Sequence, residues 1–404
     1  MAFDIVIVGG GLSGLALAAE LAQDEFSKLR VLVLEQRKSY VRDRTWSYWK
    51  TPHNAAHRYS HLERQQWSQW CVRQGVRVHR QASPPVTKDG KDAKAACYCT
   101  LDADAFYLAA QRAISQSGHV ELRLGTSVRQ IMGGDTPSVE TSEGEVIHAA
   151  WVFDARPPVQ NKANSLVQQF VGYEIKTVSD VFDPTSVQLM HFQPGTVGLH
   201  FFYVLPYSPR NALVETTWIS PASLKPDFGA ELHQFIASFV GSAAYEVVYE
   251  EKGSLNLSLR PATPNKALHV APLGRGAGTL RASTGYAFLE TLAHAAQIAA
   301  SLKSYASTGE LNNWVPAELK RRALDEWMDT VFLTVLERDW GTSSWYFMQL
   351  FERLDADTMV AFLSGRASWW QRLLVAGALP ALPFVAQALS IGFDRAPRFP
   401  GARR

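Results

Sequence analysis

The sequence has 404 residues, of which 40 are basic and 38 acidic, so its net charge of +2 provides no broad basic surface for nucleic acid. Its three cysteines, Cys71, Cys97 and Cys99, are too few for a disulfide framework, and the C-x-C has no second cluster to complete a metal site. We therefore expect neither a nucleic-acid partner nor a metal. The first apolar strand follows Met1 too closely for a signal peptide, which predicts a cytoplasmic protein.

Residues 3–37 predict a strand, a glycine turn, a helix and a second strand, the unit that binds dinucleotides. Gly9, Gly11 and Gly14 keep the G-x-G-x-x-G spacing where the strand turns into the helix, so a pyrophosphate can meet exposed N–H groups. Glu35 ends the second strand about 20 residues further on, where an acid can accept a ribose hydroxyl. The place of the motif near the N-terminus favours FAD. An ordinary βαβ unit whose glycines only relieve crowding is the alternative.

The next segment, residues 42–49 with the sequence RDRTWSYW, is too polar for a core strand and predicts a loop over the cofactor. Arg44 could meet phosphate or flavin oxygens, while Trp46 and Trp49 could cover a ring. The alternative is a solvated loop with a few packed aromatic residues. A helix is expected over residues 63–71.

Further strands and a helix should complete the nucleotide unit. Asp102 is expected to cap the helix. Residues 120–124 and 145–153 are expected in a small sheet beside the nucleotide, and Asp154 follows where the second of these strands breaks at a polar turn. Asp154 is either near the cofactor or simply at a strand end.

A hairpin is predicted from residues 200–205 and 212–218, which alternate as strands and are joined by a turn rich in proline and asparagine. Leu213, Glu215 and Thr217 share one face of the second strand. Burial among apolar neighbours would raise the pKa of Glu215 and keep it protonated near neutral pH, as a proton donor requires. The alternative is an exposed glutamate paired with Lys or Arg.

The chain then returns to the nucleotide unit through residues 270–278. A helix is expected to begin within residues 282–288 and to run toward Leu302, with Ser283 or Thr284 capping its positive end next to the flavin.

The remaining part of the chain is predicted to be helical over residues 318–336 and 344–354. Residues 369–393 are strongly apolar, but two prolines argue against one membrane-spanning helix. We expect a helical pair there, either in the core or lying in a membrane surface. The arginines of the tail, residues 395–404, would suit anionic lipid head groups or solvent.

Several of these segments resemble, in order, motifs of the lycopene cyclases, FAD-containing enzymes of carotenoid biosynthesis. The matching motifs are R-T-W-x-x-W from residue 44, D-x-R from 154, F-V-G from 170, F-D-P from 182, hydrophobic-x-E-x-T around Glu215 and T-G-Y from 284. One position departs, because the cyclases carry L-M-D-F where this chain has His191 in L-M-H-F. If the family's carboxylate takes part in the chemistry, this protein uses another group or a different substrate end; alternatively, His191 is a structural histidine. The G-D-A-x-H turn of flavin monooxygenases is absent from residues 282–288.

The resemblance implies an α/β fold with an FAD-binding, Rossmann-like domain of the glutathione-reductase type, an antiparallel β-sheet substrate domain and a helical C-terminal part. The expected boundaries are 1–160 and 266–305 for the FAD-binding domain, 161–265 for the substrate domain and 306–404 for the helical part.

The resemblance also implies the activity: reduced FAD assists a proton-initiated, non-redox closure of the ψ end groups of lycopene to β-ionone rings. Glu215 would be the catalytic acid, and NAD(P)H would serve as the reductant. The expected cofactor-binding residues are Gly9, Gly11, Gly14, Glu35, Arg44, Asp154, Thr284 and Gly285. The expected substrate-lining residues are Trp46, Trp49, Trp218 and Tyr286.

We expect a carotenoid substrate and peripheral attachment to the inner face of the membrane. An FAD-dependent monooxygenase, a cyclase of another polyprenoid and a non-catalytic carotenoid-binding flavoprotein remain alternatives. The sequence leaves open the ring type, the number of rings closed and the oligomeric state.

Overall fold

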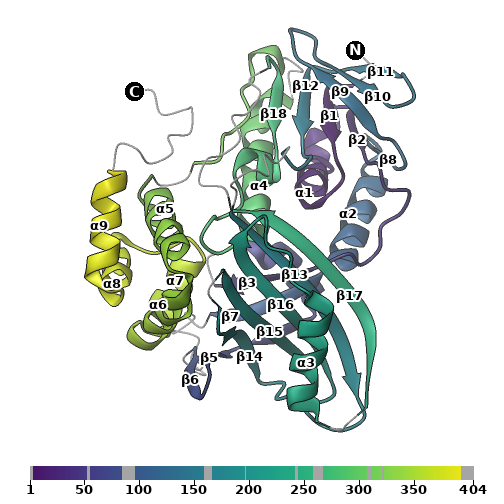
Figure 1. Cartoon of the computed structure of the whole chain (residues 1–404). Coiled ribbons are helices and arrows are strands. Elements are labelled where there is room, and N and C mark those ends of the chain that lie inside the picture. The colour runs from purple at the N-terminus through teal and green to yellow at the C-terminus, as the bar shows by residue number, and fades with distance from the viewer. Residues whose placement is uncertain are drawn as a thin grey trace, which may run out of the picture.

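The computed structural model has three parts, a parallel sheet with helices, a large antiparallel sheet and a group of C-terminal helices beside that sheet (Figure 1). It describes residues 3–51, 55–83, 96–158, 166–195, 197–241, 244–257, 267–306, 311–320 and 323–392. The arginine-rich tail, residues 395–404, lies outside the described residues.

The predicted βαβ unit is confirmed as β1 (Ile5–Val8), α1 (Leu12–Leu21) and β2 (Val31–Leu34). Both strands are buried along their whole length because helices and a second sheet cover the two faces of the parallel sheet. The sheet has the order β18-β12-β1-β2-β8. Its other strands are β8 (Val120–Arg123), β12 (Trp151–Asp154) and β18 (Val270–Pro272), and its other helices are α2 (Ala103–Ser117) and α4 (Phe288–Ala306).

A small antiparallel sheet covers one face of the parallel sheet. Its strands are β9 (Val128–Met132), β10 (Ser138–Thr141) and β11 (Val146–His148). The prediction that residues 120–124 and 145–153 both belong to the small sheet was wrong, since β8 and β12 pair in parallel with β2 and β1. Residues 145–153 split between the two sheets, because β11 ends at His148 and β12 begins at Trp151.

The large sheet has the order β17-β13-β16-β15-β14-β5-β6 and is antiparallel except for the parallel pair β14–β5, with α3 (Phe228–Val240) across one face (Figure 1). Its strands are β5 (Gln69–Gln74), β6 (Arg77–Ala82), β13 (Leu166–Thr177), β14 (Ser186–Gln193), β15 (Leu199–Ser208), β16 (Asn211–Pro221) and β17 (Tyr245–Asn256). The predicted hairpin is confirmed as β15 and β16. Strands β5 and β6, which also belong to this sheet, lie between β2 and α2 in the chain. The large sheet and the nucleotide unit are therefore interleaved in the sequence.

Two local predictions were wrong in the segment between the units. Residues 63–71 form strands instead of a helix, because Trp70 and Val72 are buried while their neighbours are exposed or half-buried, a period of two. Residues 45–49 form a strand instead of a loop. The three-stranded sheet there has the order β3-β7-β4, with β3 (Thr45–Lys50), β4 (Gln65–Trp67) and β7 (Cys97–Asp102).

The C-terminal part is helical, and it packs on the face of the large sheet opposite α3. Leu213 and Phe201 of the sheet share a core with Leu336, Phe347 and Met359 of the helices. The helices are α5 (Ala323–Arg338), α6 (Trp340–Arg353), α7 (Ala356–Leu363), α8 (Trp369–Ala378) and α9 (Ala381–Ile391). Short 3-10 helices occupy Asp24–Phe26, Ala55–Leu62, Gly274–Ala277 and Leu311–Asn313.

The predicted apolar pair is confirmed as α8 and α9, and Pro380 separates them as the N-cap of α9. Within the described part of the chain, none of the helices combines the length and the hydropathy needed to cross a bilayer.

Candidate active site

The glycine turn after β1 forms a cradle at the N-terminus of α1. Gly9 has a φ of +102°, which side chains rarely allow, and a Cβ on Gly14 would lie 1.9 Å from the carbonyl oxygen of Gly9. A Cβ on Gly11 would meet no protein atom within 4 Å, although Gly11 lines the main cavity. The first and third glycines are therefore needed by the fold, while the space beside the second is open to a ligand.

Glu35 closes the other side of this cradle at the end of β2. Its Oε2 accepts a hydrogen bond from the Gly10 N–H at 2.7 Å, and its Oε1 accepts bonds from the backbone N–H and the Nε of Arg37 at 2.8 and 3.0 Å. Burial alone would raise the pKa of Glu35, but these donors outweigh it and the pKa is lowered. Glu35 is thus a fixed acceptor that lines the cavity.

A cavity of about 1060 Å³ runs from the cradle to the inner face of the large sheet and the C-terminal helices. Ligand sites usually have volumes of about 300–1,000 Å³, so this one has room for more than one molecule of ordinary size. Its cradle end is lined by Gly9, Gly11, Ser13, Glu35, Arg44, Thr126, Arg156 and Arg275. Its far end is lined by Leu189, Phe201, Glu215, Thr217, Phe332, Phe347, Met359, Val375, Leu379 and Phe384. One end is therefore polar and basic, and the other is mostly apolar.

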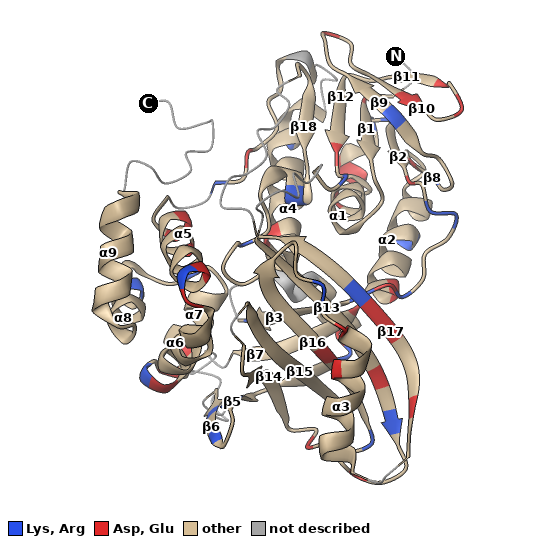
Figure 2. Ribbon diagram, in the orientation of Figure 1, with Lys and Arg blue, Asp and Glu red and all other residues tan. Residues whose placement is uncertain are grey.

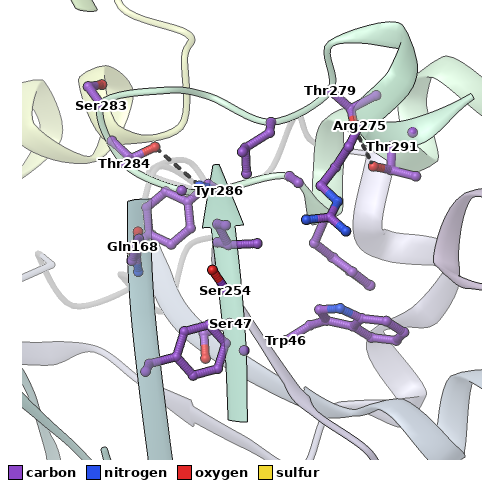
Figure 3. A pocket seen from close by; sticks show the side chains of 18 of the residues that line it. Trp46, Ser47, Gln168, Ser254, Arg275, Thr279, Ser283, Thr284, Tyr286 and Thr291 are labelled. Carbon is purple, nitrogen blue, oxygen red and sulfur yellow. Dashed lines mark hydrogen bonds between the residues drawn. The ribbon is translucent and has the colours of Figure 1, made fainter. Parts of the chain in front are cut away.

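Arg44 and Arg275 are both among the residues that line the polar end. Arg44 donates to Asp43 at 2.9 Å, whereas Arg275 has no carboxylate partner within the described residues. Burial and the charge of Arg44 both lower the pKa of Arg275, as expected of a cation that lacks a counter-charge. Figure 3 shows its guanidinium pointing into the pocket toward Trp46. Sequence reasoning missed Arg275, although a basic residue inside the G-R-G-A-G turn after a strand was a usable signal.

The segment that contains Thr284 and Gly285 crosses the cavity, but it does not cap a helix as predicted. Helix α4 begins only at Phe288, the Ser283 hydroxyl donates to Asp329 at 2.7 Å, and Thr284 Oγ1 accepts from the Tyr286 N–H at 3.4 Å (Figure 3). Both hydroxyls therefore form hydrogen bonds outside α4 and do not cap it. Thr284, Gly285 and Tyr286 all line the cavity between its two ends.

Glu215 projects from β16 into the apolar end, on the face predicted from strand alternation. Neighbouring protein atoms cover Glu215 only partly because its side chain faces the cavity. The Thr217 hydroxyl donates to Glu215 Oε1 at 2.6 Å. Burial and the nearby Glu251 raise the pKa of Glu215 to about 8, so the carboxyl keeps its proton at neutral pH. Glu251 was not identified from the sequence.

Tyrosine hydroxyls form a short chain across the cavity wall. Tyr203 donates to the Tyr98 hydroxyl at 2.8 Å, and the Tyr98 and Tyr286 hydroxyls are 3.2 Å apart. Burial raises the pKa of all three, so they are neutral. Trp46 also lines the cavity, with its ring 5.3 Å from that of Phe288. The wall therefore offers aromatic surfaces and neutral hydroxyls.

Two predicted lining residues lie elsewhere. Trp49 is 1% exposed and packs behind the cavity wall, with its ring 4.7 Å from that of Tyr98. Trp218 is on the opposite face of the large sheet, where it stacks on His200 at 4.3 Å and donates to Glu231 of α3 at 3.0 Å. The alternation that places Glu215 inward places Trp218 outward, so the Trp218 prediction was wrong.

Two further residues lie near the cavity but outside its lining. His191 lies on the α3 face, with its ring 5.2 Å from that of Phe235, and burial together with Arg73 lowers its pKa to about 4. The position at which the chain departs from the cyclase motif is therefore not part of the cavity lining. Asp154 ends β12 and its carboxylate accepts from the Arg156 Nε at 2.9 Å, while Ala155 and Arg156 form the wall.

The whole length of the chain has recognisable relatives. The model of the lycopene cyclase protein family matches residues 4–389. The lycopene beta-cyclase of Pantoea ananas is 25% identical over 96% of this chain and 98% of its own length. The lycopene beta-cyclase of Paracoccus sp. is 28% identical over 95% of each chain. Among solved structures, the halogenase PltM in complex with FAD superposes with a TM-score of 0.59 at 14% identity, over 99% of this chain and 87% of its own. The fold is thus that of FAD-dependent oxidoreductases, and the chain belongs to the lycopene cyclase protein family.

Proposed function

We propose that this protein cyclises the acyclic ψ end groups of lycopene to β-ionone rings, in a non-redox reaction assisted by reduced FAD. The observation that carries the proposal is Glu215, a carboxyl that is protonated at neutral pH and faces an apolar cavity continuous with a dinucleotide cradle. The names of the Pantoea and Paracoccus relatives support the β ring type.

The residues at the polar end fit FAD. The open space beside Gly11 at the start of α1 suits a pyrophosphate. The negative charge of the pyrophosphate would be the counter-charge that the guanidinium of Arg275 lacks. Glu35 would accept a ribose hydroxyl. When bound, reduced FAD would supply an electron-rich ring that stabilises nearby positive charge, with NAD(P)H acting only as its reductant.

Glu215 would start the reaction by giving its proton to the terminal double bond of the substrate. The O–H bond breaks, a C–H bond forms, and the next double bond attacks the resulting cation to close a six-membered ring. The tertiary cation then returns a proton to the Glu215 carboxylate and becomes the ring olefin, so the acid is regenerated and no electrons are gained or lost. The Thr217 hydroxyl would hold the Glu215 carboxylate in place between these steps.

The cavity walls would protect the cation from water and stabilise it. Phe201, Phe347 and Phe384 line the apolar end, Tyr203 adds an aromatic face beside Glu215, and Tyr286 adds one further along the cavity. Aromatic faces attract cations by about 0.5–2 kcal/mol each, most strongly where water is excluded. Since the tyrosines are neutral, they would not capture the cation as phenolates.

We further propose that α8 and α9 rest on a lipid bilayer that delivers the carotenoid. Trp369, Leu382 and Leu389 are 67%, 87% and 78% exposed, and α9 carries no charged residue (Figure 2). Leu379 and Phe384 of the same pair line the cavity. An apolar surface of this kind joined to an apolar cavity fits an interfacial helix pair.

Vesicle binding tests this part of the proposal. Leu382→Ser/Leu389→Ser should reduce co-sedimentation with phosphatidylglycerol vesicles, while cyclisation of detergent-dispersed lycopene continues. The exposed Val76→Ser, far along the chain from these helices, serves as the control. Equal binding by all three proteins would refute the membrane surface.

Anaerobic incubation of the purified protein with lycopene, FAD and dithionite tests the reaction, read from the absorption spectra of the products. We expect β-ring formation by the wild type, and a loss of at least about a hundredfold in Glu215→Gln with FAD binding retained. Glu250→Gln, on the same sheet but exposed, should match the wild type. Product formed only with oxygen would favour a monooxygenase, and full activity of Glu215→Gln would remove it from the mechanism.

A further inference from the structure

Two glutamates lie over a single glycine in the large sheet. Gly172 of β13 pairs with Glu215 of β16 on one side and with Glu251 of β17 on the other, so all three residues face the same way. A Cβ on Gly172 would lie 3.3 Å from Glu251 Cγ and 3.5 Å from Glu215 Cβ. The two acidic side chains therefore flank a position that has no side chain of its own.

The two carboxyls have different surroundings. Oε2 of Glu251 accepts hydrogen bonds from Thr45 Oγ1 at 2.9 Å and from the Tyr249 hydroxyl at 3.0 Å, and Glu251 is 4% exposed. The Arg42 guanidinium lies 3.7 Å from the centre of the Tyr249 ring. Donors and a nearby cation favour the charged form of a carboxyl. Glu215, which faces the apolar cavity, is therefore the better place for a proton.

Electrostatic coupling makes the pair share its protons. Burial raises the pKa of Glu251 to about 7, against the effect of its donors and Arg42, and burial together with Glu251 raises that of Glu215 to about 8. Two buried carboxyls this close lose their protons in two steps that belong to the pair. Besides each other, the titratable and charged groups that interact with them include Arg42, Asp102, Tyr249, Tyr207 and Tyr203.

We propose that Glu251 is a positioning residue for the cyclisation. Glu251 and Glu215 lie on either side of Gly172, and the negative charge of Glu251 keeps the proton on Glu215, whose side chain faces the cavity. Gly172 has a specific role in this arrangement, because a side chain there would crowd Glu251 Cγ and Leu213 Cδ1, at 3.3 and 3.2 Å from its Cβ. The role in cyclisation rests on the proposed function, whereas the sharing of protons does not.

The pH dependence of turnover tests the role of Glu251. Glu251→Gln keeps the shape and the acceptor oxygen but removes the charge. The alkaline limb of its kcat profile should move to lower pH by about one unit, with KM nearly unchanged. Glu250→Gln is the matched control, because Glu250 is the adjacent residue of β17 and is exposed. A profile of Glu251→Gln that coincides with the control would overturn the proposal.

A spectroscopic titration tests the pair without turnover. Infrared difference spectra of the FAD-loaded protein, with Glu215→Gln as the reference, report the carbonyl band of protonated Glu215. In Glu251→Gln this band should disappear at lower pH than in the wild type. If the wild type does not cyclise lycopene but the band shifts in Glu251→Gln, the proposed function fails and the pair stands; an unshifted band rejects the pair.

Tyr249→Phe provides a milder variant if Glu251→Gln does not fold. Loss of the hydrogen bond from the Tyr249 hydroxyl destabilises the charged form of Glu251. The proton should therefore reside on Glu251 for a larger fraction of the time. The Glu215 band and the alkaline limb should then shift in the same direction by a smaller amount. No shift in this variant would equally contradict the pair.

Discussion

Replacing Glu215 with Gln should make the stability of the protein less dependent on pH. The pKa of Glu215 is about 8 in the folded protein and 4.5 in an unfolded chain, so the folded state holds the proton more tightly. Its contribution to stability is fully present below pH 4.5 and is lost as the pH rises through 8. Because one pKa unit corresponds to about 1.4 kcal/mol, the whole difference amounts to about 5 kcal/mol at most. Water in the cavity reduces the cost of ionisation, so we expect about 2–3 kcal/mol.

Urea unfolding followed by tryptophan fluorescence at pH 5, 7 and 9 measures this effect. The free energy of unfolding of the wild type should fall relative to that of Glu215→Gln as the pH rises, because the amide cannot ionise. Glu250→Gln, which removes an exposed carboxyl from β17, should follow the wild type at each pH. Parallel curves for the wild type and Glu215→Gln would show that Glu215 ionises normally, which would refute the reasoning on its burial.

Three further predictions concern the polar end of the cavity. Gly14→Ala should prevent stable folding of the cradle, because its Cβ would lie 1.9 Å from the Gly9 carbonyl oxygen; proteolysis and circular dichroism would detect this, and a native-like variant would contradict it. Gly11→Ala should fold normally but bind FAD at least about tenfold more weakly in a fluorescence titration, since its methyl group would meet only the ligand. Arg275→Gln should weaken FAD binding by about 1.5–3 kcal/mol, and unchanged affinity would remove Arg275 from the site.

The parts of the fold set by local patterns were predictable from the sequence. The glycine turn and the β15–β16 hairpin carry short-range signals, and the alternation of β16 correctly placed Glu215 on an inward face. Residues 45–49 were misjudged because the arginines and hydroxyl groups of residues 42–49 made the segment look too polar for a core strand. They form one because β7 pairs with them, and β7 lies about fifty residues away in the sequence.

The site residues that could not be identified from the sequence reach the site through contacts between segments that are far apart in the chain. Glu251 matters only because β17 pairs with β13 and brings it beside Gly172, a register that no local pattern gives. Arg275 matters because the return segment lies beside the cradle, where a Cβ on Gly274 would lie 2.6 Å from the Ser13 hydroxyl oxygen. The predicted cap at Thr284 failed because the chain crosses the cavity before the helix begins.

Two different sets of elements form the walls of the cavity. Glu215 belongs to the large sheet, whose register is fixed by long paired strands such as β13 and β16, whereas much of the apolar surface belongs to α5–α9. Substitutions at Phe332, Met359 or Phe384 can therefore reshape the space without moving Glu215. Sequence changes in these helices would alter the size and shape of the apolar ligand that the cavity accepts, while the position of Glu215 on the sheet stays the same.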